Sequence, residues 1–205
     1  VDSICRQRDA LVIMPTGGGK SLCYQVPALL HASMADGVSC EKPLTLVLSP
    51  LIALMKDQVD ALQDKGVRAA FINSSLNRQE RETRYAQVAN GKFDLLYVTP
   101  ERFRKKEFIN VLAKRDIKLL TVDEAHCISE WGHDFRPDYT RLREFRKQVG
   151  DPTTIALTAT ATPDVQQDII RQLGIQPGDV AMFHEGIDRP NLAISVQEVW
   201  GNEEK

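Results

Sequence analysis

The chain has 205 residues, of which 42% are hydrophobic and 26% charged, and its formal net charge is −2. This composition is ordinary for a globular protein with a core of normal size, and the near-zero charge argues neither for nor against nucleic-acid binding. The longest apolar runs, such as Leu44–Leu48, are too short to span a bilayer. The segment after Val1 has no signal-peptide pattern and resembles the middle of a helix, so we expect the chain to be cut from a longer protein.

Seven short apolar runs, many rich in β-branched residues, predict β-strands. They are Ala10–Met14, Leu44–Leu48, Ala69–Ile72, Leu95–Val98, Leu119–Val122, Thr154–Leu157 and Val180–Phe183. Most are apolar at every position, which is typical of parallel strands that are covered by helices on both faces.

Helical patterns separate these runs. In Leu51–Asp64 the apolar side chains recur at helical spacing, and the charged stretch that begins near Leu76 is closed by Asn90-Gly91. The stretch Pro163–Leu173 is preceded by Thr162, which can cap a helix, and is followed by Gly174, which can end one. Alternating strands and helices predict one α/β domain over residues 1–185, with a mainly parallel sheet and helices on both faces. Residues 186–205 are predicted to be a connector. The strand-to-helix loops should gather at one edge of the sheet, where ligands bind in such folds.

The four cysteines, Cys5, Cys23, Cys40 and Cys127, form no Cys-x-x-Cys pair and have no histidine at zinc-binding spacing. We therefore expect reduced thiols in a cytoplasmic protein, with Cys5 and Cys23 in apolar surroundings.

A glycine-rich loop follows the first predicted strand and opens a helix. The segment MPTGGGKS (residues 14–21) has the context and spacing of a phosphate-binding loop, although Met14 stands where the full pattern has glycine. Glycine allows backbone N–H groups to converge on phosphate oxygens, and the helix start attracts anions. The residues predicted to bind ATP are Thr16, Gly17, Gly18, Gly19, Lys20 and Ser21. Of these, Lys20 would reach the β- and γ-phosphates and Ser21 would hold magnesium. The alternative is a plain glycine turn before a helix.

Two adjacent carboxylates follow the fifth predicted strand. Asp123 is placed to bind magnesium, and Glu124 to orient and deprotonate the attacking water, which is the division of labour that phosphoryl transfer needs. Taken alone, acidic residues at this position could equally begin a helix. Together with the phosphate-binding loop, they predict an ATPase.

The strings MPTGGGKS, DEAH (123–126) and ALTATAT (156–162) together resemble the superfamily 2 helicases. The segment CISEWGHDFRPDY (127–139) looks like the aromatic-rich loop of the RecQ helicases within that superfamily. Residues 14–29, 48–55 and 188–192 also resemble that family, so the resemblance covers nearly the whole chain. It implies a RecA-like domain in which His126 couples the ATP site to DNA and residues 129–139 sense single-stranded DNA.

The resemblance further implies a set of residues that contact DNA or transmit hydrolysis. They are Ser49, Thr99, Arg102, Trp131, His133, Phe135, Arg136, Thr158 and Thr160. Aromatic rings that stack on bases and arginines that pair with phosphate would suit such a role. The alternatives are a buried aromatic stripe at Trp131, Phe135 and Tyr139, and plain helix starts at Ser49 and Thr99.

By this resemblance the chain is the first motor lobe of a DNA helicase that moves 3′ to 5′ in repair and recombination, in the bacterial cytoplasm or nucleoid or in a nucleus. Its partners would be single-stranded and duplex DNA and a second motor lobe of the same parent chain. An adenine-recognising glutamine motif, the second lobe and a zinc-binding region would lie outside these 205 residues, so we expect negligible ATP hydrolysis by the isolated chain. The alternatives are an RNA helicase of the same superfamily and a non-catalytic nucleotide-dependent binding module.

Overall fold

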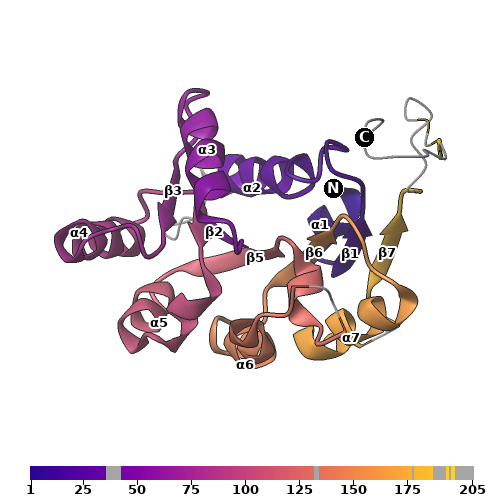
Figure 1. Ribbon diagram of the computed structural model, residues 1–205. Helices are drawn as coiled ribbons and strands as arrows, with labels where there is room; N and C mark the ends of the chain where they lie inside the picture. Colours follow the sequence, from indigo (N-terminus) through magenta and orange to yellow (C-terminus); the bar gives the residue numbers. More distant parts are fainter. Residues whose placement is uncertain (36–42, 132–133, 177, 187–192, 194, 197–205) are drawn as a thin grey trace, which may run out of the picture.

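A seven-stranded sheet with only parallel pairs runs through the computed structural model of the chain (Figure 1). The structure describes residues 1–35, 43–131, 134–176, 178–186, 193 and 195–196. The strands are β1 (Ala10–Ile13), β2 (Pro43–Leu48), β3 (Ala69–Ile72), β4 (Leu95–Val98), β5 (Asp116–Val122), β6 (Thr153–Thr158) and β7 (Ala181–His184). Their order in the sheet is β3-β4-β2-β5-β6-β1-β7. All seven predicted strands are confirmed within a few residues.

The centre of the sheet is buried on both faces. Every residue of β1, β2 and β4 is buried, and Leu46 of β2 lies in register with Leu96 on β4 and with Leu120 on β5. Continuous apolar strands of this kind are stable only when helices cover both sides. The mainly parallel α/β architecture is therefore confirmed.

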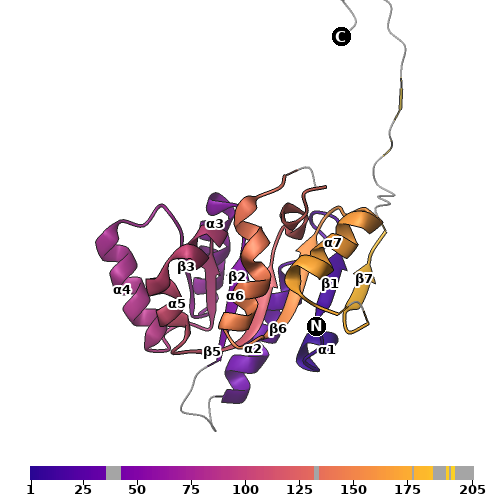
Figure 2. The ribbon, with the colours of Figure 1, turned by 90° about the horizontal axis from the view of Figure 1, so that it is seen from below.

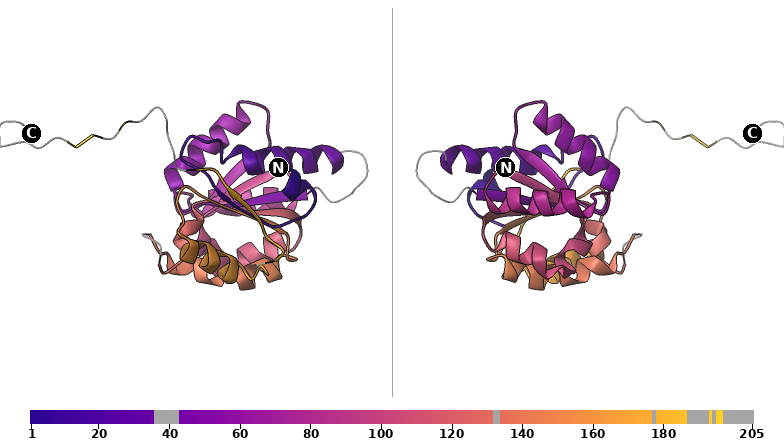
Figure 3. Two further views of the ribbon diagram at one scale, coloured as in Figure 1. Left: turned by 90° about the vertical axis from the view of Figure 1, so that its right-hand side faces the viewer. Right: turned by 90° about the vertical axis from the view of Figure 1, so that its left-hand side faces the viewer.

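Helices form one layer on each face of the sheet (Figures 1 and 3). Those on the first face are α1 (Asp2–Cys5), α2 (Leu22–Ala35) and α3 (Ile52–Gln63), whose buried side chains share a core cluster with Val12, Val47 and Tyr97. Those on the second face are α4 (Arg78–Ala89), α5 (Lys106–Leu112), α6 (Leu142–Gln148) and α7 (Pro163–Leu173), which Figure 2 shows in front of the strands.

The predicted helix ends of α4 and α7 have a local physical cause. Asn77 and Glu80 form a reciprocal capping box at the start of α4. The Thr162 hydroxyl accepts a hydrogen bond from the Val165 N–H at 3.4 Å, and Gly174 ends α7 with φ 71°, a conformation that other residues adopt only with strain.

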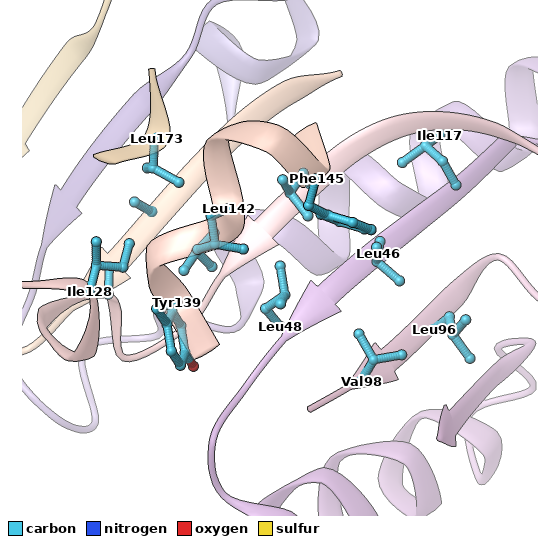
Figure 4. Packing of buried hydrophobic residues seen from close by; sticks show 14 of the residues in the cluster. Leu46, Leu48, Leu96, Val98, Ile117, Ile128, Tyr139, Leu142, Phe145 and Leu173 are labelled. Atoms are coloured by element: carbon cyan, nitrogen blue, oxygen red, sulfur yellow. The ribbon is translucent and has the colours of Figure 1, made fainter. Parts of the chain in front are cut away.

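The aromatic-rich segment does not form a continuous helix. It contains two 3₁₀ turns, η2 (Ala125–Ile128) and η3 (Pro137–Arg141). Tyr139 is completely buried and packs with Leu142 and Phe145 over the second face of the sheet (Figure 4), whereas Trp131 is 79% exposed. The buried-stripe alternative is therefore wrong for Trp131, and a DNA contact through Tyr139 is equally excluded by its burial.

Cys5, Cys23 and Cys127 are free thiols, whereas Cys40 lies outside the described residues. Cys5 is exposed, so the expectation that it lies in apolar surroundings is wrong. Within the described ranges, no helix has the length and apolar character needed to cross a membrane. Most of the predicted connector lies outside the described residues, so the boundary near residue 185 stays a prediction.

Candidate functional site

The loops that follow β1, β5 and β6 meet at the carboxyl edge of the sheet, because these strands are consecutive in the order β5-β6-β1. The Met14 N–H donates to the Thr158 carbonyl at 3.1 Å, and the Asp123 N–H donates to the Leu48 carbonyl at 2.8 Å. The glycine-rich loop and the acidic pair are therefore held on the same edge, with only β6 between their strands.

The glycine-rich loop presents backbone donors at the start of α2. Gly17 and Gly19 have φ values of 84° and 89°, which a side chain would strain. Within the described part of the chain, the N–H groups of Gly19, Lys20 and Ser21 donate to no backbone carbonyl, whereas the Leu22 N–H donates to the Gly19 carbonyl at 2.9 Å. Convergent N–H groups at a helix start are suited to bind an anion such as a phosphate.

Lys20 and Asp123 act on each other electrostatically across this edge. Lys20 Nζ folds back over the loop and donates to the Met14 carbonyl at 3.1 Å. The pKa of Asp123 is raised to about 6, chiefly by burial and also by the adjacent Glu124 charge. The Glu124 N–H, which donates to Asp123 Oδ1 at 3.0 Å, and the Lys20 charge oppose this rise. Lys20 and Asp123 therefore lie within electrostatic reach of each other at this edge of the sheet.

Glu124 adopts a left-handed backbone conformation, with φ 49° and ψ 47°. This conformation is uncommon for a residue other than glycine and is a form of strain that often occurs at functional sites. It turns the chain sharply after β5, and the Glu124 carboxylate comes to 3.3 Å from His126 Nδ1.

His126 connects the acidic pair to the end of β6. Its Nδ1 lies 3.0 Å from Thr158 Oγ1, and both side chains are buried. The Thr158 hydroxyl itself donates its hydrogen to the Thr160 carbonyl at 3.0 Å, so its oxygen acts as the acceptor of the hydrogen bond with His126. We infer that His126 Nδ1 carries a hydrogen atom. The same N–H group also lies close to the Glu124 carboxylate.

Three segments predicted to grip DNA surround a cavity of ≈ 140 Å³ at the ends of β2 and β4. Pro50, Thr99 and Arg136 line it, and an Arg136 Nη1 donates to the Pro50 carbonyl at 3.4 Å. Ser49 and Thr99 are buried, and the Thr99 hydroxyl donates to Glu101. The fold thus gathers residues 49–50, 99–101 and 136 into one surface.

The described residues of the aromatic segment differ in exposure. Trp131 projects into solvent, Phe135 is half-buried, and Arg136 holds Asp134 in an ion pair with a separation of 3.1 Å. His133 lies outside the described residues.

Arg102 is buried, although the sequence predicted that it contacts DNA. Its side chain is 8% exposed and interacts with Tyr85, and its Nε is buried without a hydrogen-bond partner among the described residues. The assignment of Arg102 as a DNA contact is wrong for this conformation, because a phosphate could not approach a guanidinium that is under the surface. The neighbouring Arg104 is exposed and pairs with Asp138.

The oxygen atoms of Ser21 and Asp123 form a hydroxyl and carboxylate donor set, which fits Mg²⁺. A buried acid whose pKa is raised, beside a second acid, would be stabilised by such a cation. A separate group of potential ligands consists of His126, Cys127 and Asp134, whose donor atoms lie within 4.8 Å of one another. Burial, with the Asp134 charge, raises the pKa of the Cys127 thiol to about 12, which disfavours the thiolate that zinc requires.

A polar network between α2, α3 and β4 was not predicted from the sequence. It consists of Tyr24 and Gln25 on α2, Gln58 on α3 and Tyr97 on β4. The signal available in the sequence was Tyr97, the one residue with a polar atom in the side chain of an otherwise aliphatic strand.

Comparison with known proteins agrees with this geometry. A family model described as DEAD/DEAH box helicase matches residues 1–169. The chain is similar to "ATP-dependent DNA helicase RecQ" of Bacillus subtilis, with 48% identity over 191 residues, 93% of this chain and 30% of that protein. It is 42% identical to the protein of the same name from Haemophilus influenzae, over 97% of this chain and 30% of that protein. The chain thus spans about a third of these curated relatives. The helicase domain of Pyrococcus furiosus Hef matches with a TM-score of 0.64 and 21% identity, over 91% of this chain and 36% of that one, and supports the fold alone.

Proposed function

This chain belongs to the DEAD/DEAH box helicase family, and from that premise we propose that it is the ATP-binding motor lobe of a RecQ-type DNA helicase. The observation that supports the proposal is the electrostatic interaction between Lys20, on the loop after β1, and Asp123, which stands beside Glu124 on the loop after β5. Strands that are not neighbours along the chain supply the two halves of one site.

Each residue of this site has a distinct chemical task. The N–H groups of residues 17–21 and the Lys20 ammonium bind the β- and γ-phosphates of ATP. Ser21 and Asp123 would hold magnesium, which when bound would neutralise charge on the phosphate oxygens. Glu124 orients the attacking water and accepts its proton.

His126 and Thr158 connect this chemistry to the rest of the motor. Loss of the γ-phosphate changes the charge beside Glu124, and the contact from Glu124 to His126 passes that change to Thr158 and Thr160. Thr160 is exposed at the edge and suits contact with a second motor lobe.

DNA binds along the adjoining surface. The phosphates of single-stranded DNA contact the exposed parts of the loops that contain the buried Ser49 and Thr99. Trp131 and Phe135 stack on its bases, in a manner that tolerates any base sequence. Arg136 pairs with phosphate. The full protein moves 3′ to 5′ along DNA and acts in DNA repair and recombination. Its location is the compartment that contains the genome.

The test is ATP hydrolysis by the full-length protein with single-stranded DNA, with single-stranded RNA and without nucleic acid. We expect strong stimulation by DNA and weak stimulation by RNA, together with unwinding of duplexes that carry a 3′ tail but not a 5′ tail. Equal stimulation by RNA would support an RNA helicase instead, and nucleotide-dependent DNA binding without hydrolysis would support a non-catalytic module.

A further inference from the structure

A network of hydrogen bonds between two buried tyrosines and two half-buried glutamines joins α2 to β4 and α3. The hydroxyls of Tyr24 and Tyr97 lie 3.4 Å apart, and both side chains are 2% exposed. The Gln25 amide nitrogen donates to the Tyr97 hydroxyl at 3.3 Å and to Gln58 Oε1 at 2.9 Å. One side-chain amide on α2 therefore bridges strand β4 and helix α3.

One end of the network reaches the magnesium ligands. The Tyr24 hydroxyl has a hydrogen bond with the Ser21 side chain. Burial raises the pKa of both phenols, and the negative charge of Asp123 raises both further. Both tyrosines thus lie within electrostatic reach of Asp123, and Tyr24 also interacts with Ser21.

The other end lies on a helix that leads to the DNA surface. Gln58 is part of α3, which begins at Ile52, just after Ser49 and Pro50. The carbonyl of Pro50 accepts from Arg136, and the Ser49 hydroxyl accepts from the Leu51 N–H at 3.5 Å. A shift or rotation of α3 would therefore move the segment assigned to the DNA backbone.

The surroundings of the network explain why its geometry is specific. Val47, Met55 and Leu119 belong to the same apolar cluster as the two tyrosines, so each tyrosine hydroxyl must find a partner or lose free energy. Apolar side chains of similar size would hold the helices together without that constraint. Hydrogen bonds of this kind fix the orientation of α3 relative to α2.

We propose that Gln25, Tyr97 and Gln58 are positioning residues that couple magnesium–nucleotide binding at Ser21 to the DNA-gripping start of α3. This inference rests on the proposed function. It assigns the coupling to a route on the first face of the sheet, distinct from the contact between His126 and Thr158.

The experiment uses the full-length protein with two substitutions of the same residue. Gln58→Met keeps the length of the side chain but removes the acceptor for Gln25, whereas Gln58→Glu retains an acceptor oxygen. Gln167→Met, on the exposed side of α7, is the matched control. Tyr97→Phe breaks the same route at its other end without changing the packing volume. For each variant, ATP hydrolysis with and without single-stranded DNA and the melting temperature are measured.

We expect Gln58→Met and Tyr97→Phe to reduce the stimulation by DNA by roughly 2- to 30-fold, the range for residues that transmit coupling between sites. Hydrolysis without DNA should stay within about twofold of the unsubstituted protein, and Gln58→Glu should restore the stimulation. Full stimulation in Gln58→Met overturns the inference, as does a loss of DNA-free hydrolysis together with a lower melting temperature, because a purely structural role predicts that pattern. If the unsubstituted protein shows no DNA stimulation, the proposed function fails first and this inference fails with it.

Discussion

The imidazole of His126 ties the ends of β5 and β6 together, because its Nδ1 lies 3.0 Å from the Oγ1 of Thr158. Both side chains are buried, so neither can exchange this partner for water at low cost. The same ring nitrogen lies 3.3 Å from Glu124 Oε2, so one histidine contacts both the acidic pair and the strand that separates this pair from the glycine-rich loop.

Thr158→Val should weaken the coupling of hydrolysis to DNA. Valine keeps the shape of the side chain but removes the hydroxyl that accepts from His126 and donates to Thr160. We expect DNA-stimulated ATP hydrolysis by the full-length protein to fall about tenfold, since the loss of one buried hydrogen bond costs about 1–3 kcal/mol. Thr154→Val is the control, because its buried hydroxyl donates to the Pro152 carbonyl at the opposite end of β6. Equal effects of the two substitutions would contradict a specific role for Thr158.

Lys20→Ala should abolish ATP turnover in the full-length protein. The ammonium is the only lysine charge that lowers the pKa of Asp123 in the described structure, and it is the group assigned to the transferred phosphate. We expect a loss of at least about 100-fold, as for other preorganised electrostatic groups. Lys65→Ala, at an exposed position after α3, should leave the rate unchanged. Unchanged turnover in Lys20→Ala would remove the central assignment.

Asp123→Asn should stabilise the metal-free chain at pH 8 but not at pH 4. The pKa of Asp123 in the folded state is raised from 3.8 to about 6, so the free energy of unfolding falls as the pH rises through that range. Above a pH of about 6, the full cost of the buried Asp123 charge is present. Asparagine removes this cost, by an amount on the order of 1–3 kcal/mol. Thermal unfolding at the two pH values measures it, with Asp57→Asn on the exposed side of α3 as the control. A gain of equal size at pH 4 would show that charge is not the cause.

Trp131→Ala should weaken DNA binding without changing stability. The indole is 79% exposed, so little packing is lost, whereas stacking on one base contributes about 1–3 kcal/mol. We expect the affinity for single-stranded DNA to fall roughly 5- to 100-fold in fluorescence anisotropy. Leu22→Ala, which truncates a 59% exposed side chain on α2, serves as the control. A lowered melting temperature with unchanged affinity would assign Trp131 to the core instead.

Tyr139→Ala should have the opposite phenotype. The ring is fully buried beside Leu142 and Phe145, so its removal should lower the free energy of unfolding by roughly 3–5 kcal/mol. Urea denaturation measures the change. Tyr139→Phe should cost much less, because the Tyr139 hydroxyl is buried without a hydrogen-bond partner among the described residues. If Tyr139→Phe destabilised the protein as much as alanine, the hydroxyl rather than the ring would be the stabilising group.

The sequence by itself determined the features that depend on neighbours along the chain. Apolar side chains at every position identified strands such as Leu95–Val98, because only a doubly covered strand can bury both faces. Thr162 and Gly174 marked the ends of α7, because capping and left-handed glycine involve groups only a few residues apart. The glycines before Lys20 indicated a phosphate-binding loop, because the N–H groups of such a loop belong to consecutive residues.

Only the tertiary structure decided which of these features meet. The order β5-β6-β1 brings Asp123 within reach of the Lys20 charge, and strand order depends on pairing between residues more than a hundred positions apart. Arg102 is buried whereas Arg104 is exposed, and Tyr139 is buried whereas Trp131 is exposed. The sequence pattern does not distinguish the members of either pair. The network from Tyr24 to Gln58 was equally hidden, since hydrogen bonds between α2, α3 and β4 exist only once the sheet has placed the two helices on the same face.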